Sequence, residues 1–209
     1  LAATEDAGLV RLHLASSLGR LAEADRWDLG VRLASRDLHA NDRLFPLLVW
    51  YGLEPTLPHA SSRALELLEQ SRQPLLTEAI SRRLGLELES HPETVEALLK
   101  LVEDGRVANP DRVLVGLAAA LEGWQRAKPP ANWESIKQKY ASNKEAAGDA
   151  VRSLQLVFGD GRAISELQAM VVDGKVAPEA RLKALKSLMK TPPPEYAPVL
   201  INLLGDRGL

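Results

Sequence analysis

Residue types that carry out catalysis or bind metals are sparse in this chain of 209 residues, and they are poorly spaced for either task. The four histidines, His13, His39, His59 and His91, stand far apart, and no H-x-x-x-H pair could hold a metal ion from one helical face. Cysteine is absent, which excludes disulfides, thiolate nucleophiles, zinc–thiolate sites and covalent haem attachment within the chain. We therefore predict no catalytic, cofactor-binding or metal-binding residue, and no enzymatic activity for this segment.

Two short motifs resemble functional ones but lack the residues that accompany them. "SRDLHAND" (35–42) brings Asp37, Asn41 and Asp42 together, as a calcium site would, yet it has no EF-hand spacing, central Gly or terminal Glu. A turn between helices with Asp or Asn as a cap explains it better. "SLMK" (187–190) has the Ser and Lys of serine–lysine hydrolases without the S-D-N and K-T-G motifs. Neither motif predicts chemistry.

The passage "GWQRAKPPANWESIKQKY" (123–140) is the least regular part of the chain and combines aromatic with basic residues. Its tryptophans flank a break at the two prolines, and Asn132 is predicted to cap the next helix. Two interpretations remain open: the side chains form an interaction surface, or the tryptophans wedge between helices and the lysines lie on solvated faces or form ion pairs within a helix. The candidate interaction surface consists of Trp124, Lys128, Trp133, Lys137 and Lys139.

The elements that must position these residues are helices throughout. Apolar residues recur with helical spacing from end to end, no convincing alternating strand pattern appears, and Gly, Pro, Asn and Asp interrupt the pattern at short intervals. Leu- and Ala-rich segments with abundant Glu, Lys and Arg favour helix. The predicted helices cover residues 6–23, 26–38, 43–53, 57–70, 74–84, 92–104, 110–127, 132–142, 145–158, 162–172, 178–190 and 195–204.

Proline and glycine mark many of these boundaries. Prolines are expected at helix starts, where a missing N–H costs nothing, and glycines at left-handed positions after helix ends. These residues are Pro74, Pro92, Pro110 and Pro178 at the starts, and Gly105, Gly159 and Gly174 after the ends.

A dozen helices joined by short loops predict an all-α fold, an α-solenoid of stacked antiparallel helical hairpins similar to HEAT or armadillo repeats. Helix pairs recur roughly every 30–45 residues, the range of such units. We expect a single domain over 1–209, or two sub-blocks over 1–127 and 132–209. Because the chain begins at Leu1, we also expect it to be a segment of a longer protein.

Charge and hydropathy exclude two kinds of partner. The net charge is −2, with 11 Lys/Arg against 17 Asp/Glu in residues 1–105 and 15 against 11 in residues 106–209. This asymmetry is too mild for a nucleic-acid-binding surface. No apolar run reaches the roughly 18 residues that span a bilayer. "LFPLLVWYGL" (44–53) is about half that length, so we predict that it packs in the core, with Leu44, Leu47, Leu48 and Tyr51 on one face.

The segment "HANDRLFPLLVWYGLEPTLPHASSRALELLEQSRQPLLTEAISRRL" (39–84) resembles the HEAT-like region of large planctomycete-type membrane-bound-dehydrogenase and haem-binding proteins. The matching features are Asn41–Asp42, the helix from Pro46 to Pro55, the Ala- and Leu-rich residues 64–68, and "PLLTEAISRRL" (74–84). Residues 5–21, 119–133 and 148–189 are similar to flanking parts of that region.

The resemblance implies a connecting solenoid between a β-propeller dehydrogenase-like domain and a cytochrome c domain with a C-x-x-C-H motif, in a periplasmic or otherwise extracytoplasmic redox protein. Haem c is then expected elsewhere in the parent protein and no cofactor in this segment, because the segment has no cysteine. Its partners are neighbouring domains of the same polypeptide or another protein. The alternative is an independent adaptor solenoid that binds a protein or peptide.

Overall fold

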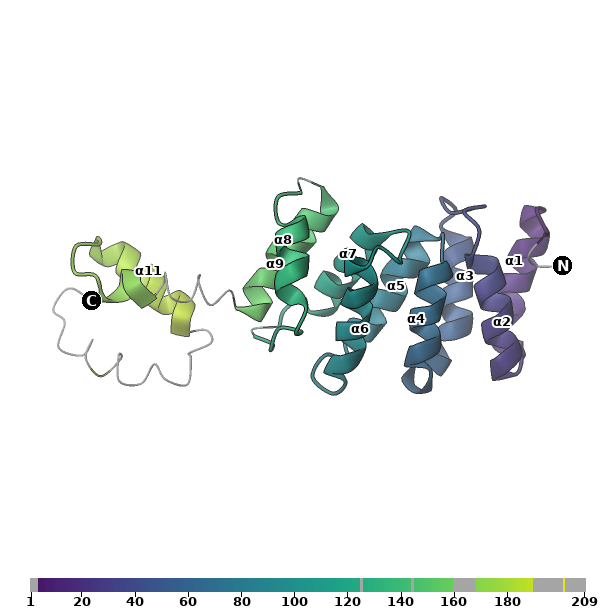
Figure 1. Cartoon of the computed structure of the whole chain (residues 1–209), viewed down its shortest axis with the longest axis horizontal. Coiled ribbons are helices and arrows are strands. Elements are labelled where there is room, and N and C mark those ends of the chain that lie inside the picture. The colour runs from purple at the N-terminus through teal and green to yellow at the C-terminus, as the bar shows by residue number, and fades with distance from the viewer. Residues whose placement is uncertain (1–3, 125, 144, 160–167, 190–200, 202–209) are drawn as a thin grey trace. The chain divides into compact units, whose positions relative to one another are not determined.

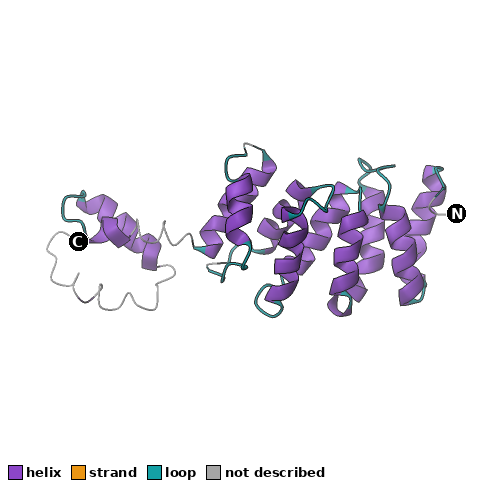
Figure 2. Ribbon diagram, in the orientation of Figure 1, coloured by secondary structure: helices purple, strands orange, loops and turns teal. Residues whose placement is uncertain are grey.

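The computed structural model describes residues 4–124, 126–143, 145–159, 168–189 and 201, except the side chains of Lys183, Ser187 and Leu188. Within these ranges the regular elements are all helices and no strand occurs (Figure 2). The predicted all-α class is confirmed. Apart from residue 201, the predicted helix over 195–204 lies outside the described residues. So do much of the helix predicted over 162–172 and the Ser187 and Lys190 side chains of the S-x-x-K match.

The chain forms two compact units. The first comprises residues 1–122 and 130–154, and the second residues 123–129 and 155–209. The contacts thus group 130–154 with the first unit, whereas the sequence suggested sub-blocks over 1–127 and 132–209. The second unit contains the end of α9 (Ala146–Phe158), a helical stretch at 168–172 and α11 (Pro178–Met189).

Eight α-helices and two short 3₁₀ helices precede α9 in the described chain. They are α1 (Gly8–Ser17), η1 (Leu18–Arg20), α2 (Glu23–Ala34), α3 (Leu44–Leu53), η2 (Glu54–His59), α4 (Ser61–Gln70), α5 (Pro74–Gly85), α6 (Pro92–Glu103), α7 (Pro110–Ala120) and α8 (Trp133–Tyr140).

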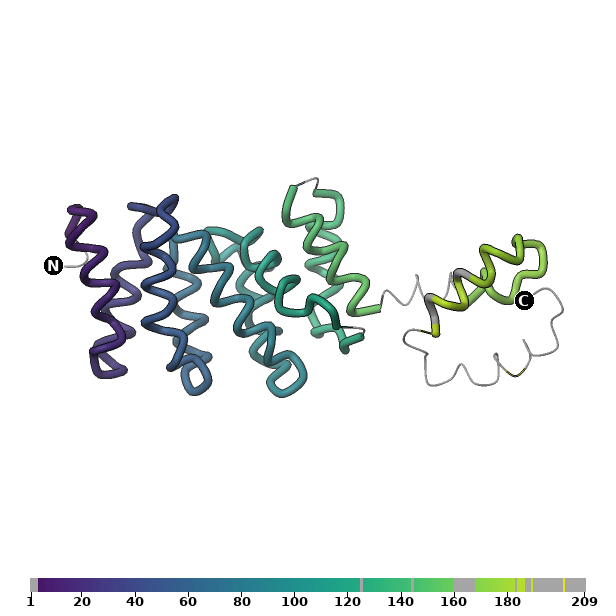
Figure 3. Tube along the Cα trace, turned by 180° about the vertical axis from the view of Figure 1, so that it is seen from behind, coloured from purple at the N-terminus to yellow at the C-terminus, as the bar shows by residue number. Residues whose placement is uncertain are grey.

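Alternate helices of the first unit pack side by side and form two layers (Figure 1). In one layer α1 contacts α3, α3 contacts α5, and α5 contacts α7; in the other, α2 contacts α4, α4 contacts α6, and α6 contacts α8. The view from behind follows the same succession along the chain (Figure 3). Each of the helices α1 to α7 therefore packs against a helix two places along the chain and against a sequence neighbour, and α8 packs against α6.

Helix α6 illustrates how the core forms and how a helix ends. Its apolar face, on which Val95, Leu98 and Val102 recur with helical spacing, is fully buried. After α6, Gly105 adopts a φ of +69°. The N–H of Arg106 donates to the Leu101 carbonyl and that of Gly105 to the Val102 carbonyl, which is the Schellman arrangement.

Most of the predicted helix boundaries are confirmed. Each of the four marked prolines is the first residue of its helix, and Gly159, like Gly105, has a positive φ. The prediction for Gly174 is wrong, because it does not adopt a left-handed conformation. The helix predicted over 57–70 begins as 3₁₀ helix η2, where Pro55 and Pro58 remove backbone donors.

Helices α5 and α7 approach each other more closely than ordinary side chains permit. A Cβ on Gly116 of α7 would meet the Glu78 carbonyl oxygen and lie 3.0 Å from the Arg82 nitrogen of α5. A Cβ on Gly85 would lie 2.7 Å from the Ala120 Cβ. Glycines on both helices therefore set the distance between them.

Candidate functional site

The rotation of α3 about its axis is fixed by the neighbours on its inner side. Phe45, Val49 and Leu53 are fully buried. Gly52 lies against Leu18 of η1, and a Cβ at position 52 would overlap that leucine side chain. A ten-residue helix with this inner face must turn its remaining apolar residues outward.

That outward face corrects the prediction that "LFPLLVWYGL" is all core. Leu44 is 64% and Tyr51 62% exposed, and Leu47 is also exposed. Leu48, predicted on the same face, is half-buried. Among the helices that the structure describes, none buries Leu44, Leu47 and Tyr51. The sequence feature that indicates an exposed apolar face is the number of apolar residues in 44–53, which is larger than one side of a helix can bury.

Helix α5 supplies the opposite wall of a groove. Its inner face holds Leu76, Ile80 and Leu84, all buried, while Leu75 and the 50%-exposed Leu86 lie on the outer side. Between the outer sides of α3 and α5 lies a cavity of about 520 Å³. We call this the α3–α5 groove; it is lined by Arg43, Leu47, Trp50, Tyr51, Glu54, Leu75, Glu78, Ala79, Arg82, Arg83 and Leu86.

Trp50 lies on this groove and is partly exposed, whereas the sequence favoured a packing role for it. Trp27 of α2, by contrast, is buried. The groove therefore presents two aromatic side chains, Trp50 and Tyr51, beside three leucines.

Charged side chains border the apolar lining, three arginines against two glutamates. Arg83 pairs with Glu87 at 2.8 Å, and Glu78 pairs with Arg112 of α7 at 3.0 Å. Arg43 and Arg82 form no ion pair with any residue that the structure describes. The groove thus carries positive charge that the described chain leaves uncompensated.

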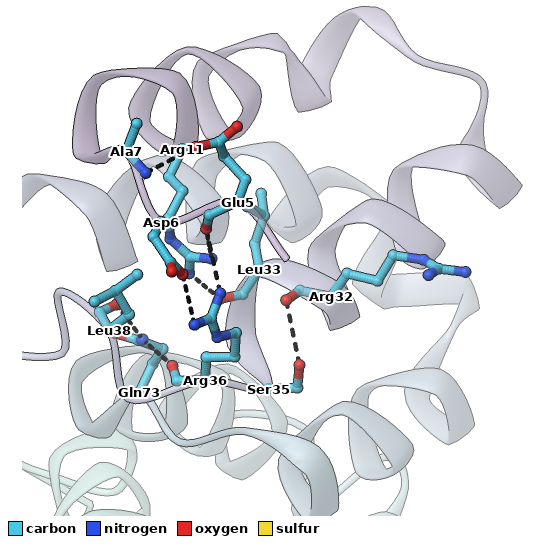
Figure 4. Close-up of polar contacts among 10 residues, drawn as sticks. All are labelled: Glu5, Asp6, Ala7, Arg11, Arg32, Leu33, Ser35, Arg36, Leu38 and Gln73. Atoms are coloured by element: carbon cyan, nitrogen blue, oxygen red, sulfur yellow. Dashed lines mark hydrogen bonds and ion pairs between the residues drawn. The ribbon is translucent and has the colours of Figure 1, made fainter. Parts of the chain in front are cut away.

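A second polar cluster lies at the junction of α1, α2 and α5, with a buried centre (Figure 4). Arg11 of α1 is fully buried, and its Nη2 donates to the Leu33 carbonyl at 2.9 Å. Its guanidinium lies 4.8 Å from the centre of the Phe45 ring, a cation–π contact. Burial lowers the pKa of Arg11, and the charge of Arg36 lowers it further.

The last four backbone carbonyls of α2 have no partner inside the helix, and the cluster and its neighbours supply hydrogen-bond donors to them. These bonds give the cluster a structural role at the end of α2. The four bonds are Ser35 N–H to Val31 (2.9 Å), Ser35 Oγ to Arg32 (3.2 Å), Arg11 Nη2 to Leu33 (2.9 Å) and Arg72 N–H to Ala34 (2.8 Å).

The loop that follows α2 is held by the same cluster. Gln73 Nε2 donates to the carbonyls of Arg36 and Leu38, and Arg36 pairs with Asp6 at 2.6 Å. Asp42 Oδ1 accepts the N–H groups of Leu44 (2.7 Å) and Phe45 (2.9 Å). The predicted capping role within 35–42 is confirmed, and these bonds lower the pKa of Asp42.

The predicted interaction residues on α8 have partners within the first unit. Trp133 is only 6% exposed. Lys137 pairs with Glu134 at 2.7 Å, as the ion-pair interpretation anticipated. Lys139 donates to the carbonyls of Val102 and Glu103 at 3.3 Å, at the end of α6.

The N-cap position of α8 is Asn132, as predicted, but its side chain has another role. Asn132 Nδ2 donates to the Glu96 carbonyl of α6 at 3.0 Å. The other two candidates, Trp124 and Lys128, belong to the second unit, where Trp124 is half-buried and Lys128 exposed. Whether the five residues take part in an interaction stays a prediction.

Within the described ranges, no group of three or more His, Asp or Glu side chains is placed to hold a metal ion. Nor does any described helix combine the length and apolar composition needed to cross a membrane. No protein-family model, no curated protein and no solved structure matches this chain.

Proposed function

We propose that the chain is an α-solenoid and acts as a non-catalytic scaffold that binds an apolar protein segment in the α3–α5 groove. The solenoid interpretation is supported by the packing of alternate helices in two layers of the first unit. A helical hairpin of this kind buries its apolar face against its neighbours, and the outer face of each layer remains available for binding.

The observation that carries the binding role is the exposed apolar lining of the groove. Leu47, Tyr51 and Leu86 face solvent over a cavity of about 520 Å³, a size typical of binding sites. Burying a large apolar side chain contributes roughly 1.5–3 kcal/mol. Aromatic residues surrounded by a polar rim are typical anchors of protein interfaces.

Binding of a neutral probe peptide tests this proposal. The probe is a synthetic amphipathic helix with leucines at i, i+3, i+4 and i+7 and glutamine elsewhere, labelled with fluorescein. We expect fluorescence anisotropy to detect saturable binding to the full chain, and Leu47→Ser to weaken it roughly tenfold, because an apolar anchor contact is lost.

The matched control is Leu156→Ser, which removes an 81%-exposed leucine from α9 outside the groove and should leave the affinity unchanged. Circular dichroism melting establishes that both variants fold. Absence of binding, or equal effects of the two variants, contradicts the proposed role of the groove.

The family resemblance supplies a context for this scaffold, and that context is likewise a proposal. By resemblance, the segment spaces a dehydrogenase-like β-propeller and a cytochrome c domain of one extracytoplasmic polypeptide. The groove would then receive a segment of a neighbouring domain. In the alternative, the chain is an independent adaptor, and the groove receives a segment of another protein.

A further inference from the structure

The charge of the α3–α5 groove indicates what its partner carries. We infer that the groove receives an acidic amphipathic helix of a partner protein, with leucine-type anchors on one face and carboxylates that reach Arg43 and Arg82. This inference rests on the proposed function and adds the chemistry and conformation of the bound segment.

The acidic character follows from the charges on the groove. Of its five charged residues, Arg83 and Glu78 already have partners in Glu87 and Arg112. The other three are Arg43, Arg82 and Glu54, which leave a net charge of +1 in a chain whose overall charge is −2. A carboxylate beside either arginine would gain charge-assisted hydrogen bonds, which are stronger than neutral ones.

Arg82 is well placed for this role. It lies in the last turn of α5, is exposed, and forms no ion pair with a described residue. Arg43 lies at the opposite wall, at the start of α3. Two cations on two walls with leucines between them match a helix whose acidic residues flank an apolar stripe.

The helical conformation follows from the walls. Both are helices whose backbone N–H and C=O groups are bonded within the helix, so neither wall offers the free edge that an extended peptide needs for strand addition. A peptide backbone that enters an apolar groove must satisfy its own hydrogen bonds. A helix does so, and it presents its side chains at i, i+3, i+4 and i+7.

The test compares three peptides with the same leucine positions. One carries glutamates beside the apolar stripe, the second carries lysines there, and the third is the neutral glutamine probe. We expect the full chain to bind the glutamate peptide roughly tenfold more tightly than the lysine peptide, by fluorescence anisotropy at low salt, with a difference that shrinks as salt is added.

Charge reversal assigns the effect to the groove. Arg82→Glu should weaken binding of the glutamate peptide roughly tenfold and strengthen binding of the lysine peptide. The matched control is Arg32→Glu, because Arg32 is also exposed in the last turn of its helix, α2, and its side chain points away from the other residues drawn in Figure 4. Reversal there should change neither affinity, and melting curves verify that both variants fold.

The outcomes separate this inference from the proposed function. If all three peptides bind equally and Leu47→Ser still weakens binding, the inference of an acidic partner is wrong and the proposal of an apolar binding groove is supported. Binding of no peptide overturns both. The inference is also overturned if Arg32→Glu removes the preference for the glutamate peptide as readily as Arg82→Glu does. The preference would then come from the charge of the whole chain.

Discussion

Single residues at helix ends hold the first unit together. Arg11 reaches the end of α2, Lys139 reaches the end of α6, and Asp42 caps the start of α3. Each side chain supplies a bond that the helix cannot make for itself. The positive groups lie at C-terminal ends and the negative group at an N-terminal end, as the helix dipole favours.

Asp42 gives a pH-dependent prediction. The N–H groups of Phe45 and Leu44 hold its pKa below the ordinary value in the folded chain. Its stabilising contribution is therefore complete above the unfolded pKa of roughly 3.9 and is lost as the pH falls through the lower, folded-state pKa. We expect Asp42→Ala to lower the Tm at pH 7, and the Tm difference from the unchanged chain to narrow as the pH falls from about 3.9 toward the lower, folded-state pKa.

Asp42→Asn is the control for this experiment, since asparagine keeps an acceptor oxygen but does not titrate. Neither Asn nor Ala titrates, so the Tm difference between these two variants should stay constant over the pH range in which Asp42 titrates. A difference between Asp42→Ala and the unchanged chain that stays constant from neutral to strongly acidic pH would contradict the capping role of the carboxylate.

At the scale of helices, the contact of α5 with α7 determines where the outer face of α5 lies. Gly116 and Gly85 bring the two helices together, which leaves Leu75, Arg82 and Leu86 on the side toward α3. Glycine in a helix interior costs about 1 kcal/mol relative to alanine, so its presence at position 116 has a packing reason.

We expect Gly116→Ala to destabilise the chain by about 2 kcal/mol, despite the better helix propensity of alanine, because the new Cβ meets the backbone of α5. Urea unfolding followed by circular dichroism measures the free energy of unfolding. Gly19→Ala is the matched control: a Cβ there meets nothing within 4 Å, and a gain of about 0.5 kcal/mol is expected. If Gly116→Ala leaves the free energy of unfolding unchanged, the two helices separate easily and the packing argument is wrong.

At the scale of the whole molecule, the proposed scaffold either acts alone or connects other domains. An antibody against the chain can isolate the native polypeptide from its source cells. We expect a mass well above 22.8 kDa and a positive stain for covalent haem, as the resemblance to multidomain dehydrogenase-like proteins implies. A haem-negative polypeptide of about 22.8 kDa would contradict the connecting role and favour the independent adaptor.

The helical class, most helix boundaries and the buried face of α6 could be predicted from the sequence. These features depend on local chemistry: prolines 74, 92 and 110 exclude themselves from helix interiors, Gly105 accepts a positive φ, and apolar residues recur with the helical period. Such preferences act over a few residues and do not require knowledge of the neighbouring helices.

Only the tertiary structure decided which apolar and polar residues are buried. Leu47 and Tyr51 look like core residues, yet they line a groove because Gly52 and Phe45 turn α3 the other way. Arg11 looks like a surface residue, yet it is buried because an unpaired carbonyl of α2 lies within its reach. Burial depends on which helices meet and how closely, and segments distant in the sequence determine both.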